Sequence, residues 1–276
     1  MPELAEIKIM AEFLNSYSDK ILYLTPRSPV GFANFDSLYG LPFKISADSR
    51  GKELKLDINV DYKGKFKNFF DSPAPSYYFM MGMTGNWMLA PKTDKVPHTR
   101  LSFDIDGEDN KLVLTDVRKF VKIRIDTQWS SKRGPCPVNE YDEFKAHVKN
   151  NLTKFKKDTI AELLLNQKYF NGIGNYLRAE ILYKANIIPW ANAYDVLNDT
   201  KSFNKIIKLC KDMPMEVYNL GGGQIKNWKN PYQKDPQLFA DWQQVYRKGK
   251  SYEDKKGRTV WYDPKLNINS ITQNEN

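Results

Sequence analysis

The chain has 276 residues, which is more than one hydrophobic core usually serves, so we expect two domains. Its 42 Lys and Arg residues outnumber 33 Asp and Glu residues, and the net charge of +9 favours a polyanionic partner. No apolar run approaches the ~20 residues of a membrane-spanning helix, and the acidic start Met1-Pro2-Glu3-Leu4 is unlike a secretory signal. Two cysteines and two histidines, far apart in sequence, provide neither a four-ligand zinc site nor a disulfide framework. We therefore expect no metal, no cofactor and a reducing intracellular compartment.

The N-terminal region, residues 1–127, is predicted to be mostly β after one short helix. Residues 4–16 have helical apolar spacing, with Glu6 in the first turn, where a helix dipole favours an acid. Apolar and polar residues then alternate as in half-buried strands, at 52–59, 101–105 and 112–114. Turn residues at 106–110 join the last two as a hairpin. We predict an N-terminal helix followed by an antiparallel β-sandwich.

The C-terminal region is predicted to be helical, which makes the fold class α+β with two domains. A polar segment with Gly and Pro at 128–140 reads as a linker, 141–239 as a helical domain and 240–276 as a hairpin with a tail. Helices are predicted at 159–170, 176–184 and 203–211. Between the first two, the glycines of Asn171-Gly172-Ile173-Gly174-Asn175 permit a tight turn. The hairpin arms are predicted at 245–246 and 259–262.

The second residue is the first candidate for chemistry. Methionine is normally removed before a small residue, and Pro2 would then present a secondary amine with an ordinary pKa of about 7.7–8.0. A lysine, with a pKa of about 10.4, would need heavy desolvation to match that nucleophile. Such an amine can attack a sugar C1′ to form an iminium, with Glu3 as a proton shuttle. Met-Pro-Glu is also an ordinary way for a protein to begin.

Further segments place basic or apolar groups at turns. Lys52 follows a glycine at the start of a predicted strand, Met83 lies between glycines, and Arg118 and Phe120 share one face if extended. Arg258 lies at a hairpin tip within residues 247–258, which hold six basic and two acidic residues.

Together with the segment NQKYFNGIGNYLRAEIL (166–182), these features resemble the formamidopyrimidine-DNA glycosylase / endonuclease VIII family of repair enzymes. The likeness is collinear from Pro2 to about Pro264. Because the four cysteines of the zinc-finger members are absent, the chain looks most similar to the zincless-finger, endonuclease VIII-like branch of eukaryotes and large DNA viruses. The resemblance implies a helix–two-turns–helix domain with a zincless β-hairpin finger. It also implies a bifunctional DNA glycosylase with AP-lyase activity in base excision repair.

The resemblance also implies a role for each matching residue. Pro2 would be the Schiff-base nucleophile, Glu3 the general acid/base, and Lys52 a catalytic residue at the phosphate beside the lesion. Glu6 would be a structural acid at the N-terminal helix. The DNA-binding residues would be Lys168, Asn175 and Arg258, and the groups filling the space of an everted base would be Met83, Arg118 and Phe120. Evicting a base costs a few kcal/mol, which inserted apolar groups partly offset. The N–H groups of the turn at 172–175 are expected to offer a phosphate site.

Structural roles remain open for several of these residues. Met83 is, on sequence alone, more readily a core residue, and Phe120 an inward strand residue. The lysines are ordinary surface charges in most proteins. The acid-free run 144–157 is either a solvated face or a DNA-facing ridge.

Two other function classes compete with the enzyme. One is a non-catalytic binder of damaged or abasic DNA, and the other is a ribosomal or RNA-binding module, which leaves the β half unexplained. The implied substrates are oxidised pyrimidines and hydantoins, released with β,δ-elimination from duplex and also from single-stranded or bubble DNA. Residues 219–234 occupy the place of a loop that covers everted 8-oxoguanine in the guanine-specific members. We expect a monomer, and the sequence does not choose between nucleus and cytoplasm.

Overall fold

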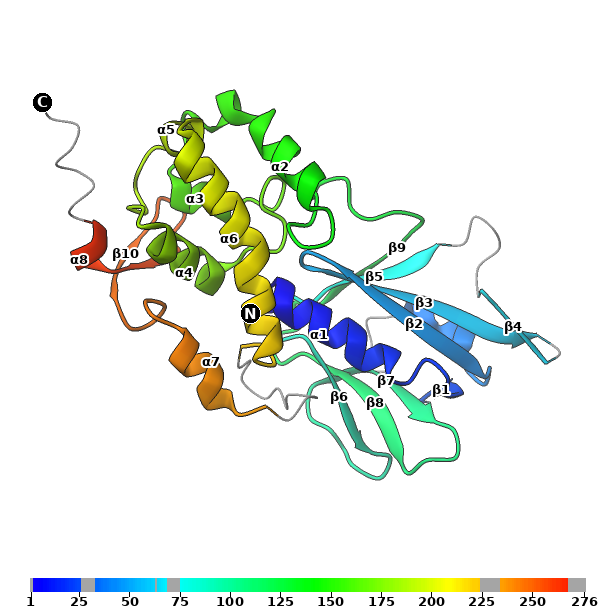
Figure 1. The fold of residues 1–276 in the computed structure, drawn as a ribbon. Helices are drawn as coiled ribbons and strands as arrows, with labels where there is room; N and C mark the ends of the chain where they lie inside the picture. Colours follow the sequence, from blue (N-terminus) through cyan, green and yellow to red (C-terminus); the bar gives the residue numbers. More distant parts are fainter. Residues whose placement is uncertain (1, 26–32, 63, 69–74, 224–233, 268–276) are drawn as a thin grey trace, which may run out of the picture. The chain divides into compact units, whose positions relative to one another are not determined.

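The computed structural model describes residues 2–25, 33–62, 64–68, 75–223 and 234–267, which fall into two compact units (Figure 1). Unit 1 contains Pro2 and Glu6–Trp129. Unit 2 contains Glu3–Ala5, Ser130–Gly223 and the described residues from Lys234 onward. No helix in the described ranges is long and apolar enough to cross a membrane.

Unit 1 is one antiparallel sheet beside a helix. The described strands run in the order β6-β8-β7-β1-β2-β3-β5-β9, with β4 paired to β3 alone. Their bounds are β1 Leu22–Leu24, β2 Phe43–Arg50, β3 Glu53–Tyr62, β4 Lys65–Asn68, β5 Ser76–Met80, β6 Asn86–Pro91, β7 Thr99–Ile105, β8 Asn110–Thr115 and β9 Lys122–Asp126. The predicted hairpin is confirmed, because Leu101 pairs with Leu114 and Phe103 with Leu112.

The core of unit 1 brings strands from opposite ends of the continuous sheet into contact, as the two layers of a β-sandwich are. Strands β5 and β6 lie near opposite ends of the pairing path, yet Phe79 of β5 contacts Trp87 of β6 with ring centroids 6.1 Å apart. Phe103 of β7 contacts the same Trp87 at 5.5 Å. Helix α1 (Leu4–Asn15) and the 3-10 helix η1 (Ala33–Leu38) add Ile7, Leu14 and Phe35, among others, to this core. The predicted alternation therefore buries one face of each strand against a shared apolar interior.

Unit 2 consists of helices and a two-stranded hairpin. The helical segments are α2 Tyr141–Lys149, η2 Leu152–Phe155, α3 Ile160–Leu164, α4 Asn175–Ala185, α5 Ala193–Asn198, α6 Thr200–Asn219, α7 Pro236–Trp242 and α8 Pro264–Asn267. The hairpin pairs β10 Lys250–Glu253 with β11 Thr259–Tyr262. These two units confirm the predicted α+β class with a helix–two-turns–helix element and a hairpin.

The helix predicted over 159–170 is wrong beyond its first turns. Helix α3 begins at a capping box, in which Thr159 and Glu162 accept each other's backbone N–H, but it ends at Leu164. Two turns follow, because side chains there bond to the backbone in place of helical partners. Asn166 Oδ1 accepts from Lys168 N at 3.1 Å, and Gln167 Nε2 donates to Ile173 O at 2.8 Å.

Two further elements differ from their predicted bounds. Helix α6 continues to Asn219, past the predicted end at 211 and through Pro214. The first hairpin arm was predicted at 245–246, but β10 starts at Lys250. The N–H groups of Val245 and Tyr246 instead donate to the buried Glu180 carboxylate at 2.9 and 2.7 Å. An acid far away in sequence therefore takes the bonds that a strand partner would have received.

Candidate functional site

The first described residues place a candidate nucleophile beside a fixed carboxylate. Pro2 and Glu3 directly precede α1 and are both buried, and Glu3 is 1% exposed. The Glu3 carboxylate accepts the N–H groups of Gly174, Tyr176 and Leu177 at 2.7, 3.0 and 3.3 Å. These N–H groups lie at the start of α4, whose dipole also favours a negative charge there. The Glu3 carboxylate is therefore held in one place next to Pro2.

This arrangement corrects one expectation about the turn at 172–175. Its N–H groups are expected to be available to a phosphate, but the chain's own Glu3 takes that of Gly174 and, in the first turn of α4, those of Tyr176 and Leu177. Gly172 N donates to Gln167 Oε1 at 3.0 Å. A phosphate at this element would therefore need side chains such as that of Asn175.

Lys52 is the second residue of the tight turn between β2 and β3, and its side chain is half-buried. Gly51, with φ of +59°, supplies the left-handed conformation that the turn requires. The turn therefore places the Lys52 amine at the end of a regular two-stranded ladder in unit 1.

The three residues matched to void filling lie on two neighbouring loops of unit 1. Met83 is 42% exposed, and Phe120 is 47% exposed, so the alternative that either is a core residue is wrong. Arg118 is also exposed, and its Nη1 lies 2.8 Å from the Met83 sulfur. Its guanidinium carbon lies 4.7 Å from the centroid of the Phe120 ring. The trio forms a small apolar and cationic group exposed to solvent.

A buried acid that sequence reasoning missed holds these two loops together. Asp116 is 1% exposed and accepts the Thr84 hydroxyl, Arg118 N at 3.3 Å and Val121 N at 2.7 Å. The close contact between the two loops also requires glycine at position 82, where an added Cβ would lie 2.7 Å from Phe120 Cβ. The exposed trio thus rests on a rigid base.

The predicted DNA-binding residues all belong to unit 2. Lys168 is exposed in the two turns, where its carbonyl oxygen lies 2.9 Å from His147 Nε2. Asn175 opens α4 and is half-buried, and Arg258 closes the turn of the β10–β11 hairpin. Gly134 packs so closely on Lys168 that an added Cβ would lie 2.4 Å from its carbonyl oxygen.

Two buried charges connect Asn175 with Arg258, and sequence reasoning missed both. Arg178 on α4 is 0% exposed and donates through Nη2 to Asn175 Oδ1 and to Thr259 O, the latter at 2.7 Å. Asp254, whose side chain is 3% exposed, forms an ion pair with Arg258 Nη2 at 2.8 Å. A sequence signal existed, since a charged residue within the apolar run of 176–182 needs a buried partner.

Aromatic packing holds the finger hairpin onto the rest of unit 2. Trp190 contacts Tyr252 of β10 and Tyr262 of β11, with centroids 5.9 and 5.3 Å apart. Those two tyrosine rings also lie 6.1 Å from each other. Among the described residues, no three His, Cys, Asp or Glu side chains gather as metal ligands. Side-chain packing therefore supports the hairpin.

Glu6, the predicted structural acid, is 1% exposed on α1. It is one of the few acids buried this deeply in unit 1, where Glu53 and Asp116 share that depth. Its burial agrees with a role inside the fold, and we keep the assignment as a prediction.

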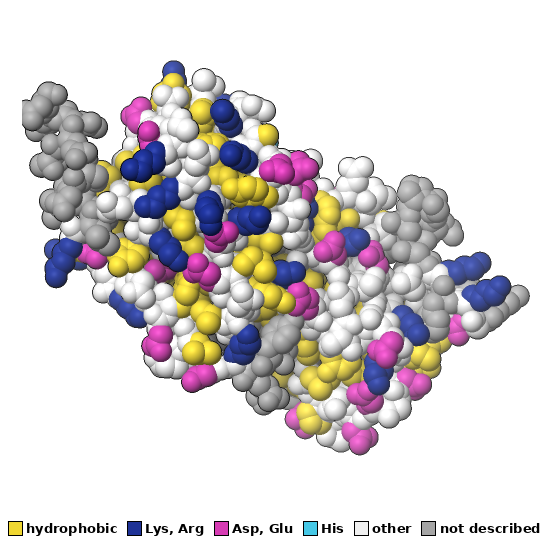
Figure 2. All heavy atoms as spheres, in the orientation of Figure 1, with side chains coloured by type: hydrophobic (Ala, Val, Ile, Leu, Met, Phe, Trp, Pro, Cys, Tyr) yellow, Lys and Arg dark blue, Asp and Glu magenta, His cyan; other side chains and the backbone are white. Residues whose placement is uncertain are grey.

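Basic side chains in unit 2 occur on more surfaces than the sequence suggested. Lys149, Lys154, Lys156 and Lys157 of the predicted ridge are exposed near the end of α2 and along η2. A further exposed row lies on α6, formed by Lys201, Lys205, Lys208 and Lys211. Figure 2 shows Lys and Arg side chains gathered over the part of unit 2 that contains α5 and α6. Part of this charge is neutralised locally, because Lys208 pairs with Asp212 and Lys184 with Glu216.

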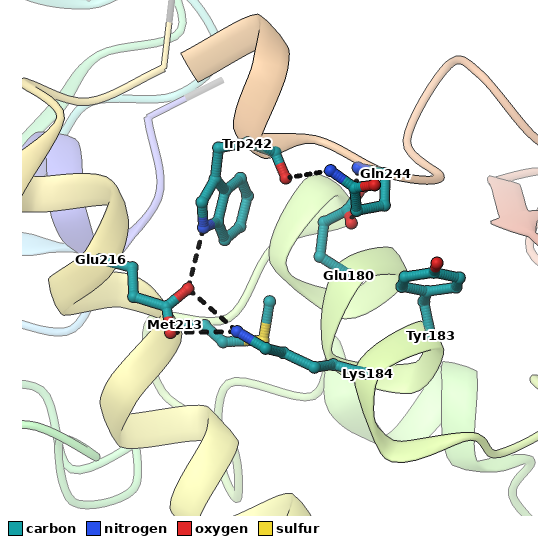
Figure 3. Close-up of a pocket in the computed structure, with 7 residues that line it drawn as sticks. All are labelled: Glu180, Tyr183, Lys184, Met213, Glu216, Trp242 and Gln244. Carbon is teal, nitrogen blue, oxygen red and sulfur yellow. Dashed lines mark hydrogen bonds and ion pairs between the residues drawn. The ribbon is translucent and has the colours of Figure 1, made fainter. Parts of the chain in front are cut away.

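A pocket of about 270 Å³ in unit 2 holds none of the predicted site residues. Its lining comes from α4, α6, α7 and the segment after α7: Glu180, Tyr183, Lys184, Met213, Glu216, Trp242 and Gln244 (Figure 3). Glu216 accepts the Trp242 indole N–H at 2.9 Å and the Lys184 amine at 3.1 Å. Glu216 on α6 therefore connects α7 and α4 through these two bonds and is already paired.

Comparison with known sequences gives consistent matches across both units. Residues 1–123 match the model of the formamidopyrimidine-DNA glycosylase N-terminal domain. The chain is 31% identical to Endonuclease 8-like 1 of Homo sapiens, over 95% of this chain and 72% of that protein. It is also 27% identical to a formamidopyrimidine-DNA glycosylase from a Wolbachia species, over 84% of this chain and 83% of that one.

Comparison with solved structures shows the same fold at low sequence identity. The MutM (Fpg) protein of Thermus thermophilus superposes with a TM-score of 0.75 at 20% identity, covering 96% of this chain and 98% of that one. Lactococcus lactis Fpg in complex with DNA containing an oxidised pyrimidine gives 0.74 at 22% identity, covering 97% and 100%.

Proposed function

Because this chain belongs to the formamidopyrimidine-DNA glycosylase / endonuclease VIII family of base excision repair glycosylases, we propose that it removes oxidised pyrimidines and hydantoins and then cleaves the strand. The observation that carries the proposal is the start of the chain. Pro2 supplies an amine after Met1 is removed, and Glu3 beside it is a carboxylate fixed by three N–H groups.

The proposed reaction uses the Pro2 nitrogen lone pair to form a bond to C1′ while the bond from C1′ to the damaged base breaks. Glu3 takes up the proton that the Pro2 nitrogen loses and passes it to the sugar ring oxygen as the ring opens to an iminium, while the departing base takes a proton from water. Loss of a C2′ proton then expels the 3′-phosphate, and a second elimination expels the 5′-phosphate. Water hydrolyses the remaining iminium and restores the amine.

We assign the remaining predicted residues to the same reaction. Lys52 holds the phosphate beside the lesion, and Lys168, Asn175 and Arg258 hold the backbone. Met83, Arg118 and Phe120 enter the space of the everted base. Their exposure supports this role, because an exposed apolar side chain can enter a base stack without first leaving a core.

Each segment of the chain has its own role in the proposed function. Residues 1–127 would carry the nucleophile and the void-filling loops, 128–140 would join the two parts, and 141–239 with the hairpin of 240–276 would bind DNA. We propose that a monomer suffices, which light scattering of the free protein and of a DNA complex tests directly.

Borohydride trapping tests the nucleophile. Reduction of the iminium should link the protein covalently to a lesion-bearing duplex, and Pro2→Gly, which replaces the secondary amine with a primary one, should diminish the adduct after mass spectrometry confirms Met1 removal. Pro91→Gly, at an exposed strand end, is the matched control and should trap normally. Undiminished trapping by Pro2→Gly would sink the assignment. Binding of an abasic duplex without nicking would instead favour the non-catalytic binder.

An excision panel tests the substrate class. Thymine glycol, dihydrouracil, spiroiminodihydantoin and 8-oxoguanine are each placed in duplex and in single-stranded DNA. We expect the pyrimidine and hydantoin lesions to be released fastest. Dominant release of 8-oxoguanine opposite cytosine would contradict the zincless-branch assignment. The loop predicted to cover an everted base lies, over residues 224–233, outside the described residues.

A further inference from the structure

The tip of the finger hairpin contains a buried acid that faces two arginines. Asp254 accepts Lys256 N at 2.9 Å and Arg258 N at 3.0 Å through Oδ1. Its Oδ2 accepts Arg258 Nε at 2.9 Å and lies 3.6 Å from Arg178 Nη1. Burial alone would raise the pKa of Asp254, but the backbone N–H groups and the Arg258 guanidinium together hold that pKa below its usual range. Asp254 is thus an anion between two guanidinium groups.

Arg178 carries two penalties that call for an explanation. It is fully buried, and it lies in the first turn of α4, where the helix dipole disfavours a cation. Burial, with repulsion from Arg258, lowers the pKa of Arg178 to about 10. In return, one guanidinium group bonds Asn175 at the start of α4 and Thr259 directly after Arg258. It therefore ties the base of the hairpin turn to the start of the helix and gives Asp254 a fixed second partner.

The geometry of Arg258 follows from these contacts. Its Nε donates to Asp254 Oδ2, and its buried Nη2 lies 2.8 Å from the same oxygen as an ion pair without a hydrogen bond, so one acceptor sets the plane of the guanidinium. Its Nη1 has no partner among the described residues, and the side chain is 34% exposed. The positive φ of Gly257, +68°, lets the turn bring Arg258 back over Asp254. The free edge of Arg258 is therefore presented in one orientation.

We propose that Asp254 is a positioning residue that holds Arg258 in the orientation needed to bind a DNA phosphate. The proposal rests on the function proposed above. It assigns to an acid a favourable effect on DNA binding, which charge repulsion alone would not predict. An acid beside a polyanion should weaken binding by repulsion, so removing its charge should tighten binding. If Asp254 orients Arg258, removing its charge weakens binding. Charge repulsion and positioning of Arg258 therefore predict opposite changes in DNA affinity when the Asp254 charge is removed.

The test measures affinity against salt for a duplex carrying a tetrahydrofuran abasic-site analogue, which the enzyme binds without cleaving. Each phosphate contact contributes roughly 0.9 to the slope of log K against log salt. Arg258→Ala should weaken binding roughly tenfold and should lower the magnitude of the slope by about 0.9, the contribution of one phosphate contact. Asp254→Asn should do the same, and the double variant should lose no more. Glu253→Gln, an exposed acid at the preceding position, is the matched control and should bind equally or more tightly.

Arg258→Lys keeps the experiment decisive if Asp254→Asn disturbs the hairpin. Lysine retains the charge at an exposed tip but lacks the forked donors that Asp254 orients, so it should behave like Arg258→Ala. Wild-type affinity and slope in either Asp254→Asn or Arg258→Lys would overturn the positioning role. An unchanged slope in Arg258→Ala would instead refute the assignment of Arg258 as a phosphate contact, which belongs to the proposed function.

Discussion

The two regions proposed to meet DNA are built in opposite ways. In unit 1, Met83, Arg118 and Phe120 are exposed, pack on one another and depend on a single buried acid, Asp116, for the shape of their loops. In unit 2, Asn175 and Arg258 are tied to buried charges, and Glu3 caps the helix that Asn175 opens. The first region fixes its backbone and leaves its side-chain tips exposed to solvent, whereas the second also fixes the side chains of Asn175 and Arg258 through buried charges.

This difference follows from what each tip has to do. An apolar wedge gains energy from any close fit in a vacated base stack, so its own orientation matters little before binding. A phosphate contact through a guanidinium depends on the direction of its N–H groups, so orientation in the free protein lowers the cost of binding. The cost is carried by buried ions, which are expensive unless every partner is in place.

The largest effect on activity is expected from Glu3→Gln, which tests whether base excision requires an ionisable carboxylate at the start of α4. The amide keeps one acceptor oxygen for three N–H groups, and it cannot donate or take up a proton. We expect base excision to fall at least about a hundredfold, with a smaller loss of cleavage at a preformed abasic site. Single-turnover rates on both substrates give the ratio.

The matched control for that variant is Glu12→Gln on α1, where the acid forms a part-exposed ion pair with Lys8 at 3.0 Å. It should leave both rates unchanged. Equal losses of excision and abasic cleavage in Glu3→Gln would contradict a proton-transfer role and leave only the capping role.

Asp116→Asn should have the next largest effect, and it tests whether one acid supports the whole unit 1 loop pair. The amide nitrogen cannot accept the N–H of Val121 or the Thr84 hydroxyl, which leaves a buried donor unpaired. We expect the free energy of unfolding to fall by about 2 kcal/mol, measured by urea denaturation. Asp106→Asn, in an exposed turn of the same unit, should change it by less than about 0.5 kcal/mol.

Phe120→Ala should separate function from stability in unit 1. Because the ring is largely exposed, the free energy of unfolding should stay within about 0.5 kcal/mol of the wild type. Excision from duplex DNA should fall about tenfold, since the cost of unstacking is less well offset. Tyr39→Ala removes an even more exposed ring from unit 1 and should leave excision intact. If Phe120→Ala lowered the free energy of unfolding as much as Asp116→Asn does, the contrast between the exposed side chains and the buried acid that supports their loops would be wrong.

The smallest effect is a pH dependence confined to unit 2. Because the pKa of Asp254 is depressed in the folded state, its stabilisation is complete above the unfolded value of about 3.9. It is lost as pH falls through the depressed folded value. The difference in unfolding free energy between wild type and Asp254→Asn should therefore be constant from pH 7 to about pH 5 and shrink below about pH 4. A difference that grows on acidification would contradict the depressed pKa.

Elements whose bonds are local could be predicted from the sequence. The β7–β8 hairpin follows from alternation and a turn, and the start of α3 follows from Thr159 and Glu162 three residues apart. The end of α3 could not be predicted, because Asn166 and Gln167 redirect backbone bonds through side chains that have equally good helical alternatives.

Contacts between distant residues account for the rest. The first hairpin arm was misplaced because Glu180 takes the N–H groups of Val245 and Tyr246. Pro2, Met83 and Phe120 are proposed as site residues from the motif in which each stands, and their roles stay predictions. Asp116, Arg178 and Asp254 were missed, because each acts on another residue's position and no short motif records that. A charge within an otherwise apolar segment is the signal that would have found Arg178.

The bond from Glu3 to the start of α4 also constrains how the molecule can be assembled. Gly174, the residue before α4, has no side chain with which to cap the helix, so the cap comes from the other end of the chain. Closing so long a loop is entropically costly and slow, which places this contact late in folding. A fragment starting at Ser130 would carry α4 with its first N–H groups unpaired. A short peptide with the sequence of residues 2–15 supplies the missing carboxylate, and its addition should complete the fragment in trans.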